Sequence, residues 1–179
     1  MLRTQDCLLL LVDVQEKLLP VMHEAEPLLA SLQRLLAGAA VLGLPVVVSE
    51  QIPDKLGPTV APLQALTTGA PTFAKQHFSC LGAPALRRHL EEIGRNQVLL
   101  AGIETHVCVY QTAVELMSLG YEVHIIADAV SSRTLRNCDL ALARLQQEGV
   151  RLSSVEMALL ELQELAGNDS FRLLLKIIR

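Results

Sequence analysis

The sequence predicts an α/β fold in which a parallel sheet is covered by helices on both faces. Apolar runs of strand length alternate along the 179 residues with longer segments of helical periodicity. The strand runs are continuously apolar, which is typical of parallel strands buried on both faces. A chain of this length and hydrophobic content can bury one sizeable core. We therefore expect residues 1–179 to form a single domain.

Four segments have the length and composition of buried strands, and two shorter segments complete the expected sheet. The clear strands are Cys7–Asp13, Pro45–Glu50, Gln97–Gly102 and Glu122–Ala127. A short strand is expected at Thr72–Lys75 and an edge strand at Arg151–Ser153. Strands that alternate with helical segments in this way indicate βαβ units.

The segments between the strands carry the periodicity of amphipathic helices. In Glu26–Leu42 the leucines share one face, and Gly43 follows where a helix commonly ends in a left-handed residue. Ser153 and Glu156 have the spacing of a capping box for the helix that begins at 155. The other expected helices are Ala83–Ile93, Val107–Leu119, Leu135–Glu148, Val155–Ala166 and Ser170–Ile178.

The segment Gln51–Pro71 interrupts this alternation, with four prolines and two glycines in 21 residues. A connection of this length in a compact domain usually packs as a structured loop or covers a site. We expect the outer wall of a pocket to come from this segment, and the sequence leaves open whether this segment or a neighbouring subunit closes the pocket.

Composition limits the partners that the chain is expected to bind. A formal charge of −4, 3% aromatic residues and no tryptophan provide no basic field and few stacking surfaces, so no nucleic acid is expected. The first apolar run, Cys7–Val12, is too short for a signal-peptide core or a membrane span. The four cysteines lack C-x-x-C spacing and are expected as free thiols. These features predict a cytoplasmic protein without a membrane segment that acts on a small molecule.

Three polar residues follow predicted strands, at the sheet edge where open parallel sheets bind ligands. Asp13 ends the first strand, Lys75 ends the short third strand, and Cys108 begins the helix after Gln97–Gly102. The positive end of a helix favours a thiolate and points backbone N–H groups at an oxyanion. Together the three residues would supply a base, an electrostatic partner and a nucleophile.

The residues alone leave alternatives open for each of these positions. Cys108 would be a metal ligand with His106, an inert core thiol or a nucleophile. The His106-x-Cys108 pair lacks a second cluster to complete a tetrahedral set, so no metal is expected. Asp13 would otherwise cap a helix or form an ion pair, and Lys75 would otherwise be a solvated surface charge. The inert reading, usual for free cysteines, is assigned to Cys7, Cys80 and Cys138.

Five segments resemble, in order, the isochorismatase-like cysteine hydrolase superfamily, which includes nicotinamidases and N-carbamoylsarcosine amidases. The combination of "SEQ" with "LGPTV" is similar to the isochorismatase domain-containing subgroup of uncertain substrate. The segments are "LLLVDVQEKLLP" (Leu9–Pro20), "VVVSEQIPDKLGPTV" (Val46–Val60), "FAKQHFSC" (Phe73–Cys80), "LLAGIETHVCVYQTA" (Leu99–Ala113) and "HIIADAVSSR" (His124–Arg133).

The resemblance implies a three-layer α/β/α fold with a six-stranded, mostly parallel, doubly wound sheet. It implies a catalytic triad of Asp13, Lys75 and Cys108, in which the acid takes the thiol proton and the lysine holds acid and thiolate in place. The thiolate then forms a covalent acyl-type intermediate that water resolves. A non-prolyl cis peptide is implied between Ile103 and Glu104, with the amides of Glu104 and Cys108 as an oxyanion hole.

One departure from the family pattern and one retained residue narrow the expected chemistry. Nicotinamidases carry an Asp-x-His pair and a further histidine that hold a metal, whereas "SEQIPDKLG" contains no histidine. Metal-dependent nicotinamidase activity is therefore disfavoured, and no cofactor is expected. The presence of Cys108 argues against the isochorismatases proper, which cleave a vinyl ether without a cysteine. Gln15 and Gln51 are candidate substrate-binding residues, with solvent-exposed glutamines as the alternative.

The leading hypothesis is a hydrolase of a small amide, or a related C–N or ester bond, that acts through Cys108. One alternative is acid/base hydrolysis by Asp13 and Lys75 without the thiol. Another is a non-enzymatic oligomeric binding or scaffold protein that retains the pocket. The leucine stripes of "MALLELQELAG" and "FRLLLKIIR" either bury a subunit interface or pack on the chain's own core, and a homo-oligomer is expected.

Overall fold

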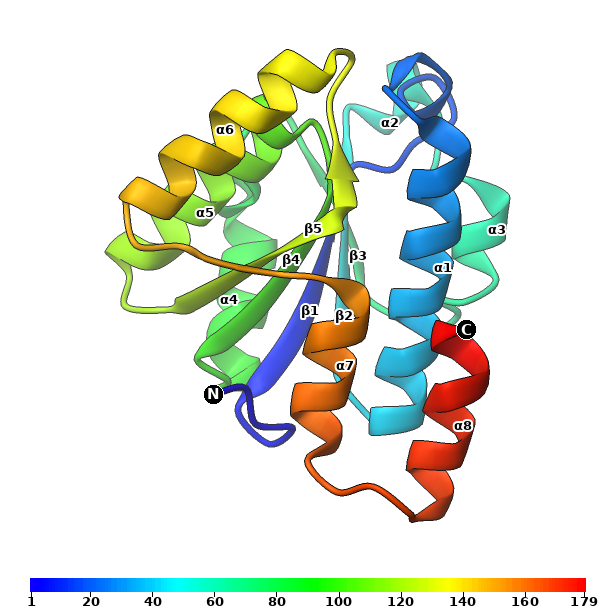
Figure 1. Cartoon of the computed structure of the whole chain (residues 1–179). Helices are drawn as coiled ribbons and strands as arrows, with labels where there is room; N and C mark the ends of the chain where they lie inside the picture. Colours follow the sequence, from blue (N-terminus) through cyan, green and yellow to red (C-terminus); the bar gives the residue numbers. More distant parts are fainter.

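The strands form one six-stranded sheet in a computed structural model that describes residues 1–179 (Figure 1). They are β1 (Cys7–Val12), β2 (Val46–Gln51), β3 (Thr72–Lys75), β4 (Gln97–Ile103), β5 (Glu122–Ser131) and β6 (Arg151–Ser153). Their order is β3-β2-β1-β4-β5-β6, and every neighbouring pair is parallel. The predicted six-stranded parallel sheet is confirmed. The strand order reverses between β1 and β4, which makes their carboxyl ends the expected ligand-binding edge.

Helices cover both faces of the sheet and complete the predicted three layers (Figure 1). They are α1 (Ala25–Leu42), α2 (Pro53–Leu56), α3 (Ala61–Gln64), α4 (Pro84–Ile93), α5 (Tyr110–Ser118), α6 (Leu135–Gln147), α7 (Val155–Gln163) and α8 (Asp169–Ile178). Helices α1, α7 and α8 pack on one face over a core of 26 buried residues. Helices α4, α5 and α6 pack on the other face over a core of 21.

Short turns connect these elements at three places. They are η1 (Leu19–Val21), η2 (Cys80–Gly82) and η3 (Thr105–Val109). The first two are 3-10 turns, and η3 is a π-helical turn between β4 and α5. The helix expected from Val107 therefore begins as regular α-helix only at Tyr110.

The capping box predicted from Ser153 is wrong. Ser153 is the last residue of β6, and its hydroxyl donates to the carbonyl of Ser154. The N-cap of α7 is Ser154, whose side chain accepts from the amide of Met157 at 3.2 Å. The amide of Val155 donates instead to Asp128. Ser153 pairs with Ile126 of β5 and therefore remains in the strand. The helix cap is for this reason the next residue, Ser154.

The proline-rich segment Gln51–Pro71 packs as a structured loop, as one of the two readings predicted. It contains α2 and α3, and it is tied to the end of β1 by a bridge between Gln15 and Thr59. The amide and hydroxyl of Thr59 both donate to Glu50, at 2.7 and 2.8 Å. The segment is therefore fixed over the carboxyl ends of β1 and β2.

Helix α1 is long and apolar enough, by length and composition, to cross a membrane. Its buried residues, among them Leu28, Leu32 and Leu36, belong to the core beneath the sheet. A central helix of a globular domain has the same length and composition, so the fold itself accounts for this hydropathy.

Candidate active site

Asp13 begins the site directly after β1. Its backbone is in the left-handed region, with φ of 53°, which turns the chain out of the strand and is tolerated by aspartate. The side chain is fully buried. Its Oδ1 accepts from the hydroxyl of Ser49 on β2 at 2.8 Å. Its Oδ2 lies 2.7 Å from Nζ of Lys75, so the ion-pair alternative for Asp13 is present.

The buried Oδ2 accepts no hydrogen bond of good geometry, although it lies 2.7 Å from the Lys75 ammonium. The separation from Nζ is that of an ion pair, but the angles do not meet those of a hydrogen bond. A buried carboxylate oxygen without a donor is costly to maintain. It therefore marks the atom of Asp13 that is free to accept a proton.

Lys75 reaches the site from β3, on the far side of β2. Its side chain is fully buried, so the alternative of a solvated surface charge is wrong. Besides Asp13, Nζ contacts three acceptors: Oε1 of Gln51 at 2.6 Å and the carbonyls of Phe78 at 3.0 Å and His77 at 3.2 Å. An ammonium has three protons, and these acceptors leave none for a substrate. Lys75 is thus placed to act on its neighbours and not on a substrate directly.

The charge of Lys75 is preserved by its surroundings. Burial lowers the pKa of the ammonium, but the negative charge of Asp13 raises it, and the net pKa lies above the usual value of 10.5. Lys75 therefore stays cationic at physiological pH and stabilises negative charge at the end of β1.

Cys108 lies in the turn η3 and is nearly buried. Burial raises the pKa of its thiol from 9.0 to about 12, the negative charge of Asp13 adds to this, and Lys75 opposes it. A helix macrodipole is worth about 0.3–1 kcal/mol, less than one pKa unit, so it cannot offset burial. The expectation that the helix start favours a resting thiolate is therefore wrong. The thiol is protonated and needs a base.

Gly102 allows β4 to approach β1 at the site. It pairs with Val12 and has φ of +119°. A Cβ at this position would lie 2.1 Å from the carbonyl oxygen of Val12. Only glycine fits this backbone, and it begins the turn that leads through Ile103 and Glu104 to Cys108. The Ile103–Glu104 peptide bond is cis, as the resemblance implies.

Glu104 and His106, on either side of Thr105, are held by residues near the end of β5. Oε2 of Glu104 lies 3.0 Å from Nε of Arg133. Nδ1 of His106 lies 2.9 Å from the hydroxyl of Ser132. No group of three or more His, Cys, Asp or Glu lies close enough together to hold a metal ion. The structure thus pairs His106 with a serine and gives it no ligand set.

Gln15 and Gln51 are buried, so the alternative of solvent-exposed glutamines is wrong. The Gln15 amide pairs with the main chain of Gln51, at 2.8 and 3.1 Å, and donates to the carbonyl of Gly57 at 2.6 Å. The Gln51 amide accepts from Lys75 and donates to the carbonyl of Gln76 at 2.9 Å. Both side chains are satisfied within the protein, and substrate binding by either stays a prediction.

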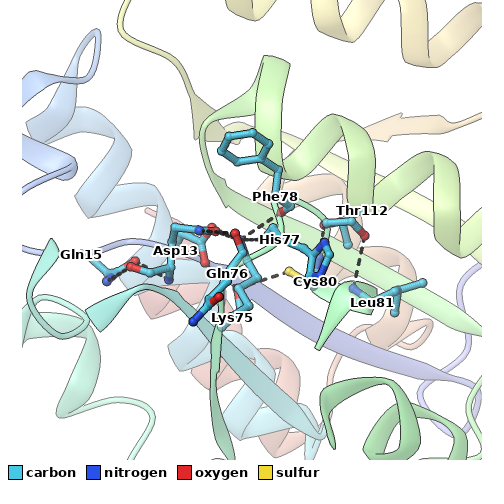
Figure 2. A network of polar contacts seen from close by, with 12 residues as sticks. Asp13, Gln15, Lys75, Gln76, His77, Phe78, Cys80, Leu81 and Thr112 are labelled. Atoms are coloured by element: carbon cyan, nitrogen blue, oxygen red, sulfur yellow. Dashed lines mark hydrogen bonds and ion pairs between the residues drawn. The ribbon is translucent and has the colours of Figure 1, made fainter. Parts of the chain in front are cut away.

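Ser49 and Cys80 join the site without having been predicted for it. The thiol of Cys80 donates to the hydroxyl of Ser49 at 3.3 Å. The Cys80 amide donates to Thr112 of α5 at 3.0 Å, and both of these residues are labelled in Figure 2. Burial and the charge of Asp13 raise the pKa of the Cys80 thiol to about 11. Cys80 is buried, as assigned, but it is not isolated from polar groups. The position of Ser49 near the end of a predicted strand was the available signal.

A cavity of about 550 Å³ lies beside β3, next to these residues. Lys75, Gln76 and His77 line one side, and Ile52 and Pro53 of the proline-rich segment line another. That segment therefore lines a cavity beside Lys75, but neither Asp13 nor Cys108 lines it. A pocket wall over Cys108, from this segment or from a neighbouring subunit, stays a prediction.

The fold and this arrangement define a class of α/β protein with a buried acid and cation beside a thiol at the switch point of the sheet. The family model of the isochorismatase domain matches residues 7–157. Isochorismatase domain-containing protein 1 of Danio rerio is 42% identical over 168 residues, which are 93% of this chain and 59% of that protein. The chain belongs to the isochorismatase-like hydrolase family, which confirms the resemblance found in the sequence.

Two solved structures share the fold over nearly the whole chain. MAR1 ribonuclease from Caenorhabditis elegans has a TM-score of 0.93 and 32% identity, covering 99% of this chain and 91% of that one. The YcaC gene product of Escherichia coli, an octameric hydrolase of unknown specificity, has a TM-score of 0.94 and 25% identity, covering 99% and 88%.

Proposed function

We propose that the protein hydrolyses a small amide, or a related C–N or ester bond, through a covalent intermediate on Cys108. The observation that carries the proposal is the fully buried Asp13–Lys75 ion pair at 2.7 Å, which faces the Cys108 thiol. A buried ion pair is costly to assemble and is weak support for stability alone. A pair of this kind beside a thiol that needs a base is typical of nucleophilic catalysis.

The proposed reaction begins with proton transfer from the Cys108 thiol to Oδ2 of Asp13. The thiolate attacks the substrate carbonyl, and the proton held by Asp13 passes to the leaving amine or alcohol as its bond to carbon breaks. A water then attacks the thioester and gives a proton to Asp13, which returns it to the departing sulfur. The acid product leaves, and thiol and carboxylate are regenerated.

Lys75 acts in this scheme through charge and position. Its ammonium holds the Asp13 carboxyl group in place and stabilises the thiolate while Asp13 holds the proton. The amides of Glu104 and Cys108 are the proposed oxyanion hole, since N–H donors aimed at the developing charge are the usual source of such stabilisation.

The proposal is tested by a panel of small amides and esters with wild type, Cys108→Ala and Asp13→Asn. We expect turnover in the wild type, a trapped acyl adduct on the peptide containing Cys108 by mass spectrometry, and loss of both in Cys108→Ala. Cys7→Ala is the matched control, because Cys7 is a buried thiol at the other end of β1 and should leave turnover unchanged. Activity retained in Cys108→Ala would instead support acid/base hydrolysis by Asp13 and Lys75.

The same substrate panel also tests whether the protein is a binding or scaffold protein, or a ribonuclease. No turnover and no adduct on any substrate would favour a binding or scaffold protein. Single-stranded RNA is included because the Caenorhabditis elegans relative is named a ribonuclease. We expect no cleavage, since a net charge of −4 and 3% aromatic residues provide few phosphate or base contacts. RNA cleavage that is lost in Asp13→Asn would overturn the small-molecule proposal.

We further propose that the chain forms a homo-oligomer. The octameric state of the YcaC protein supports this, and so do exposed leucines on the outer helices, among them Leu135, Leu140 and Leu173. Leu174 of α8 is buried in the core, so the C-terminal stripe also packs on the chain itself. Light scattering after size exclusion should give a multiple of 19.5 kDa. A single 19.5 kDa species would contradict the proposal.

A further inference from the structure

Asp13 is oriented by Ser49 and Cys80, which act on the carboxylate oxygen that does not contact Lys75. The thiol of Cys80 donates to the Ser49 hydroxyl at 3.3 Å, and the Ser49 hydroxyl donates to Oδ1 of Asp13 at 2.8 Å. Ser49 and Cys80 are both fully buried. The direction of donation is fixed, because a carboxylate only accepts and the serine has one proton.

The hydrogen bonds from Cys80 to Ser49 and from Ser49 to Asp13 give the two carboxylate oxygens of Asp13 different surroundings. Oδ1 accepts a hydrogen bond from a buried donor, whereas Oδ2 accepts none of good geometry and lies 2.7 Å from the Lys75 ammonium. Rotation of the carboxylate would break the bond to Ser49 inside the protein, where an unmade hydrogen bond is expensive. Ser49 therefore determines which oxygen remains available.

We propose that Ser49, supported by Cys80, is the positioning residue that presents Oδ2 of Asp13 as the proton acceptor and sets how readily Asp13 accepts it. This inference rests on the proposed role of Asp13 as base for Cys108. Ser49 does not take part in bond making. A donor to a carboxylate stabilises the ionised form, so its loss makes Asp13 easier to protonate.

Cys80 is anchored so that it can serve this role. Its amide donates to Thr112 of α5 at 3.0 Å, and the preceding Ser79 donates to Glu115 of the same helix at 2.5 Å. The turn that carries Cys80 is thus docked on the helix that follows Cys108. Donors in series strengthen one another in a buried chain, so the Cys80 thiol makes the Ser49 hydroxyl a better donor.

The test is the rate at which iodoacetamide labels Cys108 as a function of pH, read by mass spectrometry. If Asp13 takes the thiol proton, labelling rises along an acid limb to a plateau, and the limb belongs to the coupled Asp13–Cys108 pair. The titratable groups that face Asp13 are Lys75 from β3, Cys80 from η2 and Cys108 from η3. All three are unchanged in Ser49→Ala.

We expect Ser49→Ala to move the midpoint of the acid limb to higher pH by about one unit, because Asp13 becomes easier to protonate. Ser49→Thr keeps the hydroxyl and should restore the limb. Cys80→Ala should give a smaller shift in the same direction, and it tests the chain independently if Ser49→Ala does not fold. Ser153→Ala is the matched control, because Ser153 is a buried strand serine at the end of β6.

The inference is overturned if folded Ser49→Ala and Cys80→Ala keep the wild-type limb, or if Ser153→Ala shifts it equally. Failure of the proposed function looks different. In that case the wild type shows no acid limb, or Asp13→Asn keeps the limb that Ser49→Ala was meant to move. Circular dichroism and thermal unfolding of each variant establish that the fold is intact before the profiles are compared.

Discussion

Burial raises the pKa of two thiols at opposite ends of the sheet to about 12, but the charged groups around the two thiols differ. Cys7, at the amino end of β1, has a pKa raised to about 12 by burial, which a backbone hydrogen bond with Leu99 and the charge of Arg95 partly offset. Cys108, at the carboxyl end of β4, also has a pKa of about 12, but the charge of Asp13 adds to burial. The value alone therefore does not identify the reactive thiol. What differs is the presence of a base.

The surroundings of the two thiols explain the difference. The only hydrogen-bond acceptor for Cys7 is the carbonyl of Leu8, 3.8 Å away, and a carbonyl cannot take a proton in this pH range. Cys108 interacts with the carboxyl group of Asp13, which is held by the buried Lys75 ammonium. Around Cys7, at the amino end of the sheet, the structure is explained by packing. At the carboxyl end, a buried charged pair is present although burying charge is costly to stability. Four measurements test this contrast, from the largest expected effect to the smallest.

Removal of the buried cation should have the largest effect. Lys75→Met leaves Asp13 as a buried, unpaired carboxylate, and we expect the free energy of unfolding to fall by about 3–5 kcal/mol. Arg87→Met, which breaks an exposed pair with Glu91, is the control and should cost less than about 1 kcal/mol. Urea unfolding of both variants makes the comparison. An equal loss of unfolding free energy in the two variants would show that the buried ion pair matters no more to stability than the exposed one.

The glycine at the site should tolerate substitution less well than a glycine at the amino end. Gly102→Ala places a Cβ against the carbonyl of Val12 and should cost about 2–4 kcal/mol through overlap and backbone strain. Gly43, at the end of α1, has φ of +65° with open space around it. Gly43→Ala should cost only about 1–2 kcal/mol, the penalty of the left-handed conformation. Thermal unfolding of the two variants would contradict this ranking if Gly43→Ala were the more damaging.

Alkaline pH should weaken the fold through the thiol at the amino end. The folded pKa of Cys7 lies above the ordinary value of 9.0, so its contribution to stability is complete below pH 9 and is lost as pH rises toward 12. Between pH 9 and 10.5, below the usual pKa of lysine, unfolding free energy should fall by up to about 1.4 kcal/mol per pH unit for this thiol. Cys7→Ala should show a shallower decline in urea titrations. If unfolding free energy falls equally steeply with pH in Cys7→Ala, Cys7 is not the cause of the decline.

Alkylation should distinguish the two thiols near neutral pH despite their equal pKa values. We expect iodoacetamide to label Cys108 about tenfold faster than Cys7, because Asp13 can take the proton of Cys108. Access also favours Cys108, so Asp13→Asn is the control that keeps access and removes the base. The advantage of Cys108 should fall in that variant. Equal, slow labelling of both thiols in the wild type would contradict the assignment of Cys108 as nucleophile.

The sequence by itself determined the layers of the fold and the edge at which the site lies. Continuous apolar runs and helical periods specify parallel strands covered on both faces, and strand ends specify one edge. Asp13, Lys75 and Cys108 could therefore be named from their positions after strands. The strands themselves began and ended within two residues of expectation, except that β5 extends to Ser131.

Only the tertiary structure decided the protonation of Cys108 and the surroundings of Asp13. Burial depends on contacts from the whole fold, and in Cys108 it outweighs the helix-start effect that local sequence suggests. Ser49 and Cys80 lie 31 residues apart, and Gln15 and Gln51 lie 36 apart, so no local pattern pairs them. A periodic signal reports which face of an element is buried, whereas hydrogen-bond partners across strands follow from sheet order and register.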